Sequence, residues 1–402
     1  MTSNSFTQTC KGLLVPAVLA LVMGGTAFAL DKCDRGYGDV RALCLLALGL
    51  TVFVLQYWRI PATTTTNTDR HLLWLSVVVL VVLGATSMRQ SLDDLPNRPR
   101  CDIGWTTTDA VHALVSDLEN PYESKWIGKL GPEAKYWGYH YGPGTILSYL
   151  PAEALGPGGV KLLNLLYLGL TFYLIAALVR RAENRQAGSA AAVFAIMLAC
   201  LPDPVWSETF RQGATDILPT MLILAGLLAI HDRHWFLAGA LAGYSVSCKI
   251  LPGFLFVVLL ARWPPNLRIL AGVLSGMLPL ALAAVWDCGA LVNNMILFHG
   301  TKPPDDTSLY AVFPSAVTRF FPLFQAAILA GFWIRNRRRQ FDVPDLATQL
   351  FLLMVLIEVF YKEIHCNHLL WFFPLAAVLF ARGWRRATQP TSDVQPSIRN
   401  GR

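Results

Sequence analysis

The chain has 402 residues, of which 54% are hydrophobic and 15% charged, with 33 basic and 26 acidic side chains and a net charge of +7. A soluble protein carries about 25% charged residues, so a series of soluble domains is disfavoured. The basic residues stand in short blocks between long apolar runs, which argues against nucleic-acid binding. The eight cysteines show neither zinc-ligand spacing nor a disulfide pattern. Composition therefore indicates a membrane protein.

A helix needs about 20 apolar residues to cross the hydrocarbon core of a bilayer. The sequence predicts an all-α polytopic membrane protein with about 12 transmembrane helices, at 12–30, 41–57, 71–88, 159–179, 187–202, 216–231, 234–247, 250–262, 267–286, 311–333, 346–361 and 367–382. The first stretch has an alternative interpretation as a secretory signal, because Ala27-Phe28-Ala29 resembles a cleavage site.

Lys and Arg residues in short loops remain on the cytoplasmic side and so set the orientation of the helices. With the N-terminus inside, the Arg180-Arg181 pair and the run Arg337-Arg338-Arg339 face the cytoplasm. The same alternation places the long polar segment 89–158 outside, with shorter outer loops at 203–215, 287–310 and 362–366. We therefore divide the chain into N-terminal transmembrane helices, an extracytoplasmic catalytic loop, a transmembrane bundle with substrate-binding outer loops and a disordered cytoplasmic tail, at 1–88, 89–158, 159–382 and 383–402.

The long outer segment opens with Asp102 and continues into an amphipathic pattern. Thr106 and Asp109 have the spacing of a capping box, and apolar residues follow at helical spacing, at Val111, Leu114, Val115 and Leu118. The pattern predicts a helix that begins near Thr106, with Asp109 in its first turn. Asp102 would then precede the helix at the membrane exit, as a general base or as an exposed loop acid.

A dense aromatic run follows in the same segment, at Tyr136, Trp137, Tyr139, His140 and Tyr141. Such rings are typical of an interfacial aromatic belt. They are equally suited to a wall on which the apolar face of a sugar packs. The residues alone leave both interpretations open.

The remaining outer loops contribute charged and hydrogen-bonding groups. Gln212 and Asp216 lead into a span, where Asp216 has an alternative role as a helix cap. Lys249 lies between two short apolar runs, where a partner, a ligand or snorkelling to the interface would be needed. Lys302 lies in the third outer loop. His365 and His368 have i, i+3 spacing suitable for metal, but no third ligand pattern accompanies them.

These motifs, taken in order, resemble the polyprenyl-phosphate-mannose-dependent mannosyltransferases, integral-membrane enzymes with the glycosyltransferase C-type fold. The resemblance covers about 90–380 and rests on Asp102-Ile103, Asn120-Pro121-Tyr122, Tyr139-His140-Tyr141-Gly142-Pro143, Gln212, Asp216, Gly243 to Lys249 to Pro252, Pro303-Pro304, Ser308-Leu309-Tyr310, His368, Trp371 and Pro374. Two features depart from the family: two further spans precede the catalytic loop, and Asn367 stands where relatives tend to carry the first of paired histidines.

The resemblance implies an inverting transferase that moves a sugar from a polyprenyl-phosphate donor to the hydroxyl of a glycolipid or glycan acceptor. Mannose is the sugar that the resemblance implies, with arabinose and glucose as alternatives. It implies an active site outside a bacterial plasma membrane, without cofactor or obligatory metal. Asp102 matches the general base, and Lys249 and His368 match positions that meet the donor phosphate. We expect Tyr139, His140, Gln212, Asp216, Lys302 and His365 to bind substrate or donor.

A twelve-helix transporter of a polar or anionic solute is the main alternative, and a non-catalytic membrane scaffold is a further one. Transporters usually have two related halves with a site near the midplane of the membrane. Here no internal repeat is evident, and Glu358 is the clearest midplane charge. The sequence therefore favours the transferase.

Overall fold

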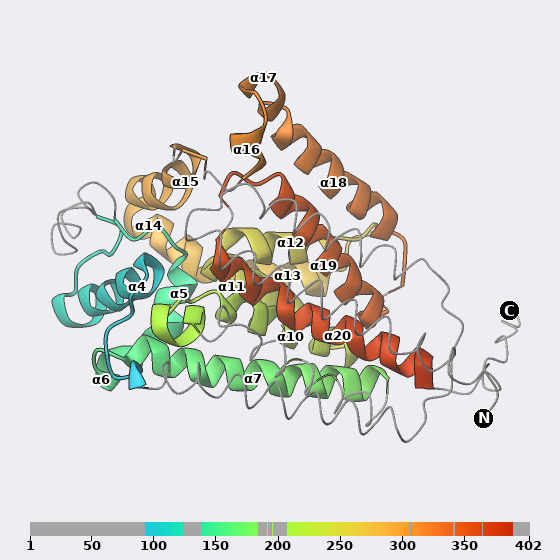
Figure 1. Ribbon diagram of the computed structural model, residues 1–402, viewed down its shortest axis with the longest axis horizontal. Helices are drawn as coiled ribbons and strands as arrows, with labels where there is room; N and C mark the ends of the chain where they lie inside the picture. Colours follow the sequence, from blue (N-terminus) through green and yellow to red (C-terminus); the bar gives the residue numbers. More distant parts are fainter. Residues whose placement is uncertain are drawn as a thin grey trace, which may run out of the picture.

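The computed structural model describes residues 93–123, 138–183, 191, 195, 207–301, 303–304, 308–340, 342–363 and 365–388. The spans expected at 12–30, 41–57 and 71–88, the signal-like segment and most of 187–202 lie outside the described residues, as does Lys302. Every regular element among the described residues is helical (Figure 1). An all-helical protein was expected, whereas the number of twelve spans stays a prediction.

Three described segments are long and apolar enough to cross a membrane: Gly159–Ala182, Leu278–Gly300 and Ser315–Asn336. The first is α7, whose 24 residues extend about 36 Å at 1.5 Å per residue. The third contains α17 (Ser315–Thr318) and α18 (Phe321–Asn336). The shorter or interrupted helices are α10 (Ile217–His231), α11 (Trp235–Cys248), α12 (Ile250–Leu260), α13 (Leu267–Gly276), α19 (Val343–Val359) and α20 (Leu369–Thr388).

The stretch 267–286, expected as one span, is two helices. Helix α13 ends at Gly276 and α14 (Leu278–Val292) begins two residues later, with Pro279 in its first turn. A proline lacks the N–H of an interior helical residue and its ring clashes with the preceding turn, so the helix breaks there. The chain then continues through the π-helical turn η5 (Asn293–Leu297) into α15 (Phe298–Thr301), so the first part of the expected loop 287–310 is helical.

Helices α11 and α12 form a hairpin with a single residue, Lys249, between them. Its backbone is extended (φ −148°, ψ 119°). A Cβ on Gly253 of α12 would lie 2.2 Å from the backbone nitrogen of Val246 in α11, so the two helices fold back on each other at close range. The helices expected at 234–247 and 250–262 are therefore both present, with Lys249 at their tip.

Glycines also bring α11 and α13 together. A Cβ on Gly239 would lie 2.2 Å from the carbonyl oxygen of Ile269, and one on Gly276 would lie 2.1 Å from that of Ala240. Gly243 and Gly272 complete a small-residue seam at four-residue spacing, which lets membrane helices approach closely. The seam fixes α11, and with it the position of Lys249.

The buried core lies where α7, α10, α19 and α20 pack together (Figure 1). Helix α19 is buried over most of its length. By contrast, α14 and α18 expose large apolar side chains such as Leu282, Val285, Leu323 and Ile334. Outward-facing apolar residues on long helices are what a bilayer requires of the surface that contacts it.

Candidate functional site

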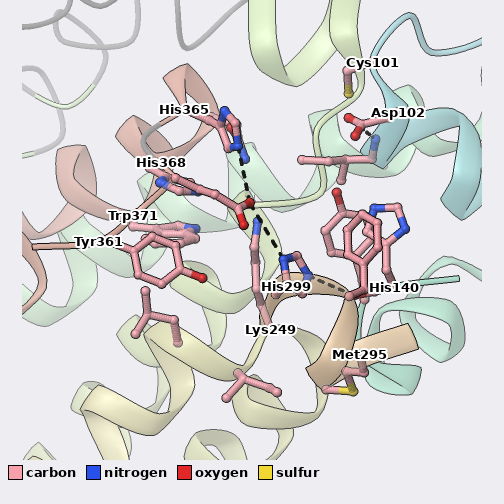
Figure 2. Close-up of a pocket in the computed structure, with 18 of the residues that line it drawn as sticks. Cys101, Asp102, His140, Lys249, Met295, His299, Tyr361, His365, His368 and Trp371 are labelled. Atoms are coloured by element: carbon pink, nitrogen blue, oxygen red, sulfur yellow. Dashed lines mark hydrogen bonds and ion pairs between the residues drawn. The ribbon is translucent and has the colours of Figure 1, made fainter. Parts of the chain in front are cut away.

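A cavity of about 580 Å³ lies between the start of α4 (Asp102–His112), the α11–α12 junction, the η5–α15 segment and the loop before α20 (Figure 2). Six of the residues expected to form the site line it: Asp102, His140, Gln212, Lys249, His365 and His368. They come from segments up to 266 positions apart in the sequence, so the fold brings together what the order of the motifs predicted.

Asp102 is the first residue of α4, and the predicted start near Thr106 was wrong. The cap is Cys101, whose Sγ accepts a hydrogen bond of 3.4 Å from the backbone N–H of Gly104. The Thr106 hydroxyl donates a hydrogen bond to the carbonyl oxygen of Asp102, four residues earlier. Thr106 is therefore an interior residue of the helix and does not cap it. A carboxylate in the first turn interacts favourably with the helix dipole, and the exposed Asp102 side chain reaches the cavity.

The apolar pattern beyond Asp102 is buried only in part. Val111 is 1% exposed, whereas Val115 and Leu118 are 44% and 81% exposed. The helix widens into a π-helical turn, η2 (Ala113–Asp117), so the spacing that would align these residues on one face is lost. Asp109 lies in the latter half of α4, not in its first turn, and forms an ion pair with Arg98. Burial raises the pKa of Asp109, against the opposing effect of Arg98.

A buried ion pair fixes the segment that precedes Asp102. The Lys161 side chain of α7 is fully buried and donates to the Asp94 carbonyl at 2.7 Å and to its carboxylate at 2.9 Å. Arg100 contacts the other carboxylate oxygen at 2.7 Å. Burial raises the pKa of Asp94, but the hydrogen bonds from Arg100, Lys161 and Asn97 outweigh it, so the pKa lies below its ordinary value. Asp94 therefore stays ionised and ties this segment to α7.

The backbone of Gln212, which also lines the cavity, holds the same segment. Its carbonyl accepts hydrogen bonds from the N–H groups of Arg100 and Cys101, at 3.0 and 3.1 Å. The next residue, Gly213, has φ +77°, and a Cβ there would lie 2.7 Å from the Pro99 Cβ. Only glycine fits such a close approach in this conformation. The backbone at 212–213 therefore fixes the start of α4.

Lys249 has a buried carboxylate partner, Asp216. Asp216 is fully buried and, instead of capping α10, accepts hydrogen bonds from Lys249 Nζ, from Asn367 Nδ2 at 2.7 Å and from Trp371 Nε1 at 2.8 Å. The Lys249 ammonium also lies 5.1 Å from the centre of the Trp371 ring and 5.4 Å from that of Tyr141, where the ring faces attract a cation. Asp216 does not line the cavity but holds the lysine that does.

His368 lies beside this group. Its ring stacks on that of Trp371 with a centroid separation of 4.1 Å and an interplanar angle of 17°. Its Nδ1 forms a hydrogen bond with the carboxyl group of Glu358 in α19. Asn367, which departs from the family's paired histidines, contacts Asp216 instead.

Another carboxylate, Glu363, lines the cavity and contacts two histidines that Figure 2 labels, His299 and His365. Its Oε2 is 3.8 Å from His299 Nδ1 and 3.7 Å from His365 Nε2. His299 Nε2 lies 3.2 Å from the carbonyl oxygen of His140. Within the part of the chain that the structure describes, no group of three or more such side chains is arranged to hold a metal ion. These contacts instead join the loop at 361–368 to α15 and to the aromatic run.

The aromatic run divides between core and cavity. Tyr139 is fully buried and shares a hydrogen bond of 3.2 Å with Thr107. Its ring packs edge-on against Tyr122 and Tyr141, and burial raises the pKa of both Tyr139 and Tyr141. His140 and Tyr141 line the cavity, with ring centroids 4.3 Å apart. Tyr139 thus supports the ring that lines the cavity.

One side of the cavity is apolar and reaches the surface. Ile250 and Phe254 of α12 and Ile296 of η5 line it, and they are 39%, 44% and 55% exposed. Leu251, Met295 and Phe298 extend the same side. The cavity therefore combines polar groups with an apolar flank that is open to the surface of the protein.

Sequence reasoning did not single out several residues that line the cavity: Glu208, His299, Tyr361 and Glu363. Trp371 also lines it and was part of the family resemblance, but no role was predicted for it. Glu208 lies four positions before Gln212, a spacing that places two side chains on one face of a helical turn. His299 lies in α15, and Tyr361 and Glu363 lie in the loop before α20, so these side chains meet only through packing between distant segments.

A family model, glycosyltransferase family 87, matches residues 139–358. The chain belongs to this family. A search among curated proteins finds no match. Among solved structures, the chain is similar to ArnT from Cupriavidus metallidurans, in a crystal structure bound to undecaprenyl phosphate (TM-score 0.52) and in one in the apo state (TM-score 0.51). Identity is 14% in both, over 79% of this chain and 60% of ArnT.

At this identity the similarity to ArnT concerns the fold. The family 87 chain shares the helical glycosyltransferase architecture of an integral membrane protein over most of its length, although it spans only 60% of ArnT. The family match begins at Tyr139, the aromatic run, and ends at Glu358, the buried partner of His368. The C-type glycosyltransferase fold expected from the sequence is thus supported.

Proposed function

We propose that this family 87 chain transfers a sugar from a polyprenyl-phosphate donor to an acceptor hydroxyl on the extracytoplasmic side of a bacterial plasma membrane. The observation that carries the proposal is that one cavity is lined by the carboxylate of Asp102 and by the ammonium of Lys249 (Figure 2). Figure 2 places Asp102 on one side, with His365, His368 and Trp371 on the other. Mannose is the sugar that the family resemblance favours.

Asp102 acts as the general base. Its carboxylate accepts a hydrogen bond of 2.8 Å from the N–H of Ile103 and is otherwise exposed. An acceptor hydroxyl can therefore approach it, and the proton that it removes can pass to solvent. One base is sufficient for a single displacement with inversion, because a phosphate leaves without obligatory protonation.

Lys249 and His368 stabilise the departing phosphate. The phosphate gains negative charge as the bond to the sugar breaks, so a preplaced cation stabilises the transition state more than the ground state. Asp216 accepts a hydrogen bond from the lysine and is itself held by Asn367 and Trp371. The Trp371 ring also lies against the ammonium. His140, Gln212 and His365 are placed to contact the sugar or the donor. Lys302 remains a prediction.

The apolar flank supports a lipid-linked donor. Ile250, Phe254 and Ile296 connect the cavity to the surface that faces the bilayer. A polyprenyl chain lying against these residues would present its phosphate towards Lys249 without leaving the membrane. ArnT, which has a similar fold, has been crystallised with undecaprenyl phosphate.

The test is to reconstitute the purified protein in vesicles with an acceptor-rich membrane extract and a panel of radiolabelled polyprenyl-phosphate sugars. We expect one sugar to be incorporated into a glycolipid or glycan, with inverted anomeric configuration by NMR. Failure of every donor, combined with uptake of a polar solute into the vesicles, would favour the transporter. Labelling of single cysteines introduced at exposed positions between 93 and 119 tests the side, which we expect to be extracytoplasmic.

A further inference from the structure

Glu358 is a buried acid that the proposed reaction does not yet use. It is 1% exposed within α19, and one of its oxygens, Oε2, has no hydrogen-bond partner among the described residues. Its other oxygen bonds to His368 Nδ1. An ionisable side chain in the interior of a membrane helix bundle is costly and marks a functional position by default.

The hydrogen bond with Glu358 fixes which nitrogen of His368 is available. Nδ1 is occupied, and Nε2 makes no hydrogen bond to any described residue. The ring is held flat against Trp371, and its small exposed fraction, 6%, belongs to a side chain that lines the cavity. Nε2 is therefore the atom through which His368 can meet a ligand.

His368 carries a proton on Nε2 whether the proton shared with Glu358 lies on Nδ1 or on the carboxyl group. An uncompensated charge is strongly disfavoured in a buried site, so the pair is either imidazolium with carboxylate or imidazole with carboxylic acid. Both forms have zero net charge, and in both the proton on Nε2 is present. A histidine without the carboxyl partner could donate this proton only from its imidazolium form.

We propose that Glu358 and His368 act as one proton donor for the phosphate that leaves the donor lipid. This inference rests on the proposed transferase function. As the bond between the sugar carbon and the phosphate oxygen breaks, its electrons go to the phosphate, and the Nε2 proton is transferred to a phosphate oxygen. The remaining proton stays between Nδ1 and Glu358. The acceptor hydroxyl proton passes to Asp102, and solvent restores both groups.

The charged and titratable groups around the pair are compatible with this role. Lys249 from the α11–α12 junction, Asp216 before α10, and His365 and Glu363 from the loop before α20 act on it electrostatically. Lys249 and Asp216 pair with each other, and His365 lies 3.7 Å from Glu363. The charges of Lys249 and Asp216 thus offset each other, and Glu358 is the carboxyl group bonded directly to His368. Glu358 is a positioning residue, since it acts through His368.

The experiment compares Glu358→Gln with the wild-type protein in the vesicle assay across pH. A glutamine leaves neutral imidazole unable to give up its Nε2 proton, so we expect kcat to fall more than tenfold at pH 7.5, with little change in the donor KM. The alkaline limb of the pH profile should move to lower pH by about one unit or more. Glu358→Asp keeps a carboxyl group and should recover part of the rate, which a purely structural role would not predict.

A second donor isolates the proton transfer. A donor lipid with fluorine substituents next to its phosphate releases a less basic phosphate, so the penalty of Glu358→Gln should shrink several-fold. The penalty of Asp102→Asn should not. Gln349→Leu, a change at another buried polar residue of α19, is the matched control and should retain wild-type kinetics.

The outcomes separate this inference from the function on which it rests. Two results would overturn the proton-donor pair and leave the transferase intact. One is a wild-type protein that transfers sugar and a Glu358→Gln variant whose pH profile is unchanged. The other is a loss of rate in Glu358→Gln that is equal with both donors. Absence of wild-type transfer from every polyprenyl-phosphate sugar would overturn both. If Glu358→Gln does not purify as a folded protein, the same two-donor comparison with Glu358→Asp decides the question.

Discussion

The two walls of the cavity are constructed differently. Lys249 is surrounded by a buried carboxylate, two ring faces and the tight end of a helical hairpin. The carboxylate of Asp102 has one hydrogen bond to a described residue, from its own helix, and is exposed. In the proposed reaction this difference has a reason. A group that stabilises developing charge gains from being held in place, whereas a base must admit an acceptor and exchange its proton with solvent.

The largest loss of activity is expected when the base on the exposed wall of the cavity is removed. Asp102→Asn should lower kcat by about 10²–10⁴-fold, the usual contribution of general-base catalysis, with unchanged expression and thermal stability. The measurement is single-turnover transfer of radiolabelled sugar in vesicles. Asp93→Asn, which changes an exposed acid of the same segment, should retain activity. Full activity of Asp102→Asn would remove this residue from the mechanism.

Removing the cation should harm both chemistry and stability. Lys249→Met should lower kcat by about 10²–10³-fold, the typical cost of losing one charge-stabilising donor, and should weaken donor binding more than acceptor binding. Because it leaves Asp216 buried and unpaired, we also expect a loss of about 3–5 kcal/mol of stability. Lys362→Met, in a neighbouring loop, is the control. Equal weakening for donor and acceptor would indicate that Lys249 is structural.

The base wall also has a rigid support, which can be tested separately. Lys161→Met removes the buried cation of Asp94 and leaves it with the exposed Arg100 alone, so stability should fall by up to about 3–5 kcal/mol, seen as a lower Tm in detergent. Joint replacement as Lys161→Met with Asp94→Leu should recover most of this loss, since an apolar pair of similar volume is often as stable. A double variant as unstable as the single one would show that the ion pair is not the cause.

The smallest effect on stability is expected from the exposed pair of His112 in α4 and Glu153. The hydrogen bond with Glu153 raises the pKa of His112, and the same bond lowers the pKa of Glu153. The histidine contribution is therefore fully present below its unfolded pKa of 6.5 and is lost as the pH rises through the raised folded value. We expect a small decrease in Tm from pH 6 to pH 8 that is absent in Glu153→Gln. Identical pH dependence in both proteins would contradict this.

The sequence predicted which residues line the cavity better than it predicted the local structure and contacts that position them. Long apolar runs and the position of Lys249 between two short ones were sufficient to predict α7, α10 and the α11–α12 hairpin. The break before Pro279 was readable in principle, since a proline there ends the preceding helix. The start of α4 was not, because its cap is a cysteine sulfur, which lies outside the usual set of capping residues.

The remaining features depend on contacts between distant segments. Asp216 precedes a helix and so resembles a cap, but its carboxylate bonds to side chains 33, 151 and 155 positions away. The π-helical turn after α4 changes the side-chain period in a way that no apolar pattern reveals. The bond between Glu358 and His368 spans only 10 positions, but it depends on the turn of the chain between α19 and η6 (Cys366–His368).

The single-residue connection between α11 and α12 has a consequence for changes in chain length. Each residue of an α-helix turns the following side chains by about 100°, and Lys249 has no flexible loop on either side to absorb such a rotation. Inserting or deleting one residue between Gly243 and Lys249 would therefore turn the ammonium away from its carboxylate or force the glycine seam out of register. We therefore expect this hairpin to accept substitutions at its exposed apolar positions, such as Phe236 and Phe254, far more readily than any insertion or deletion.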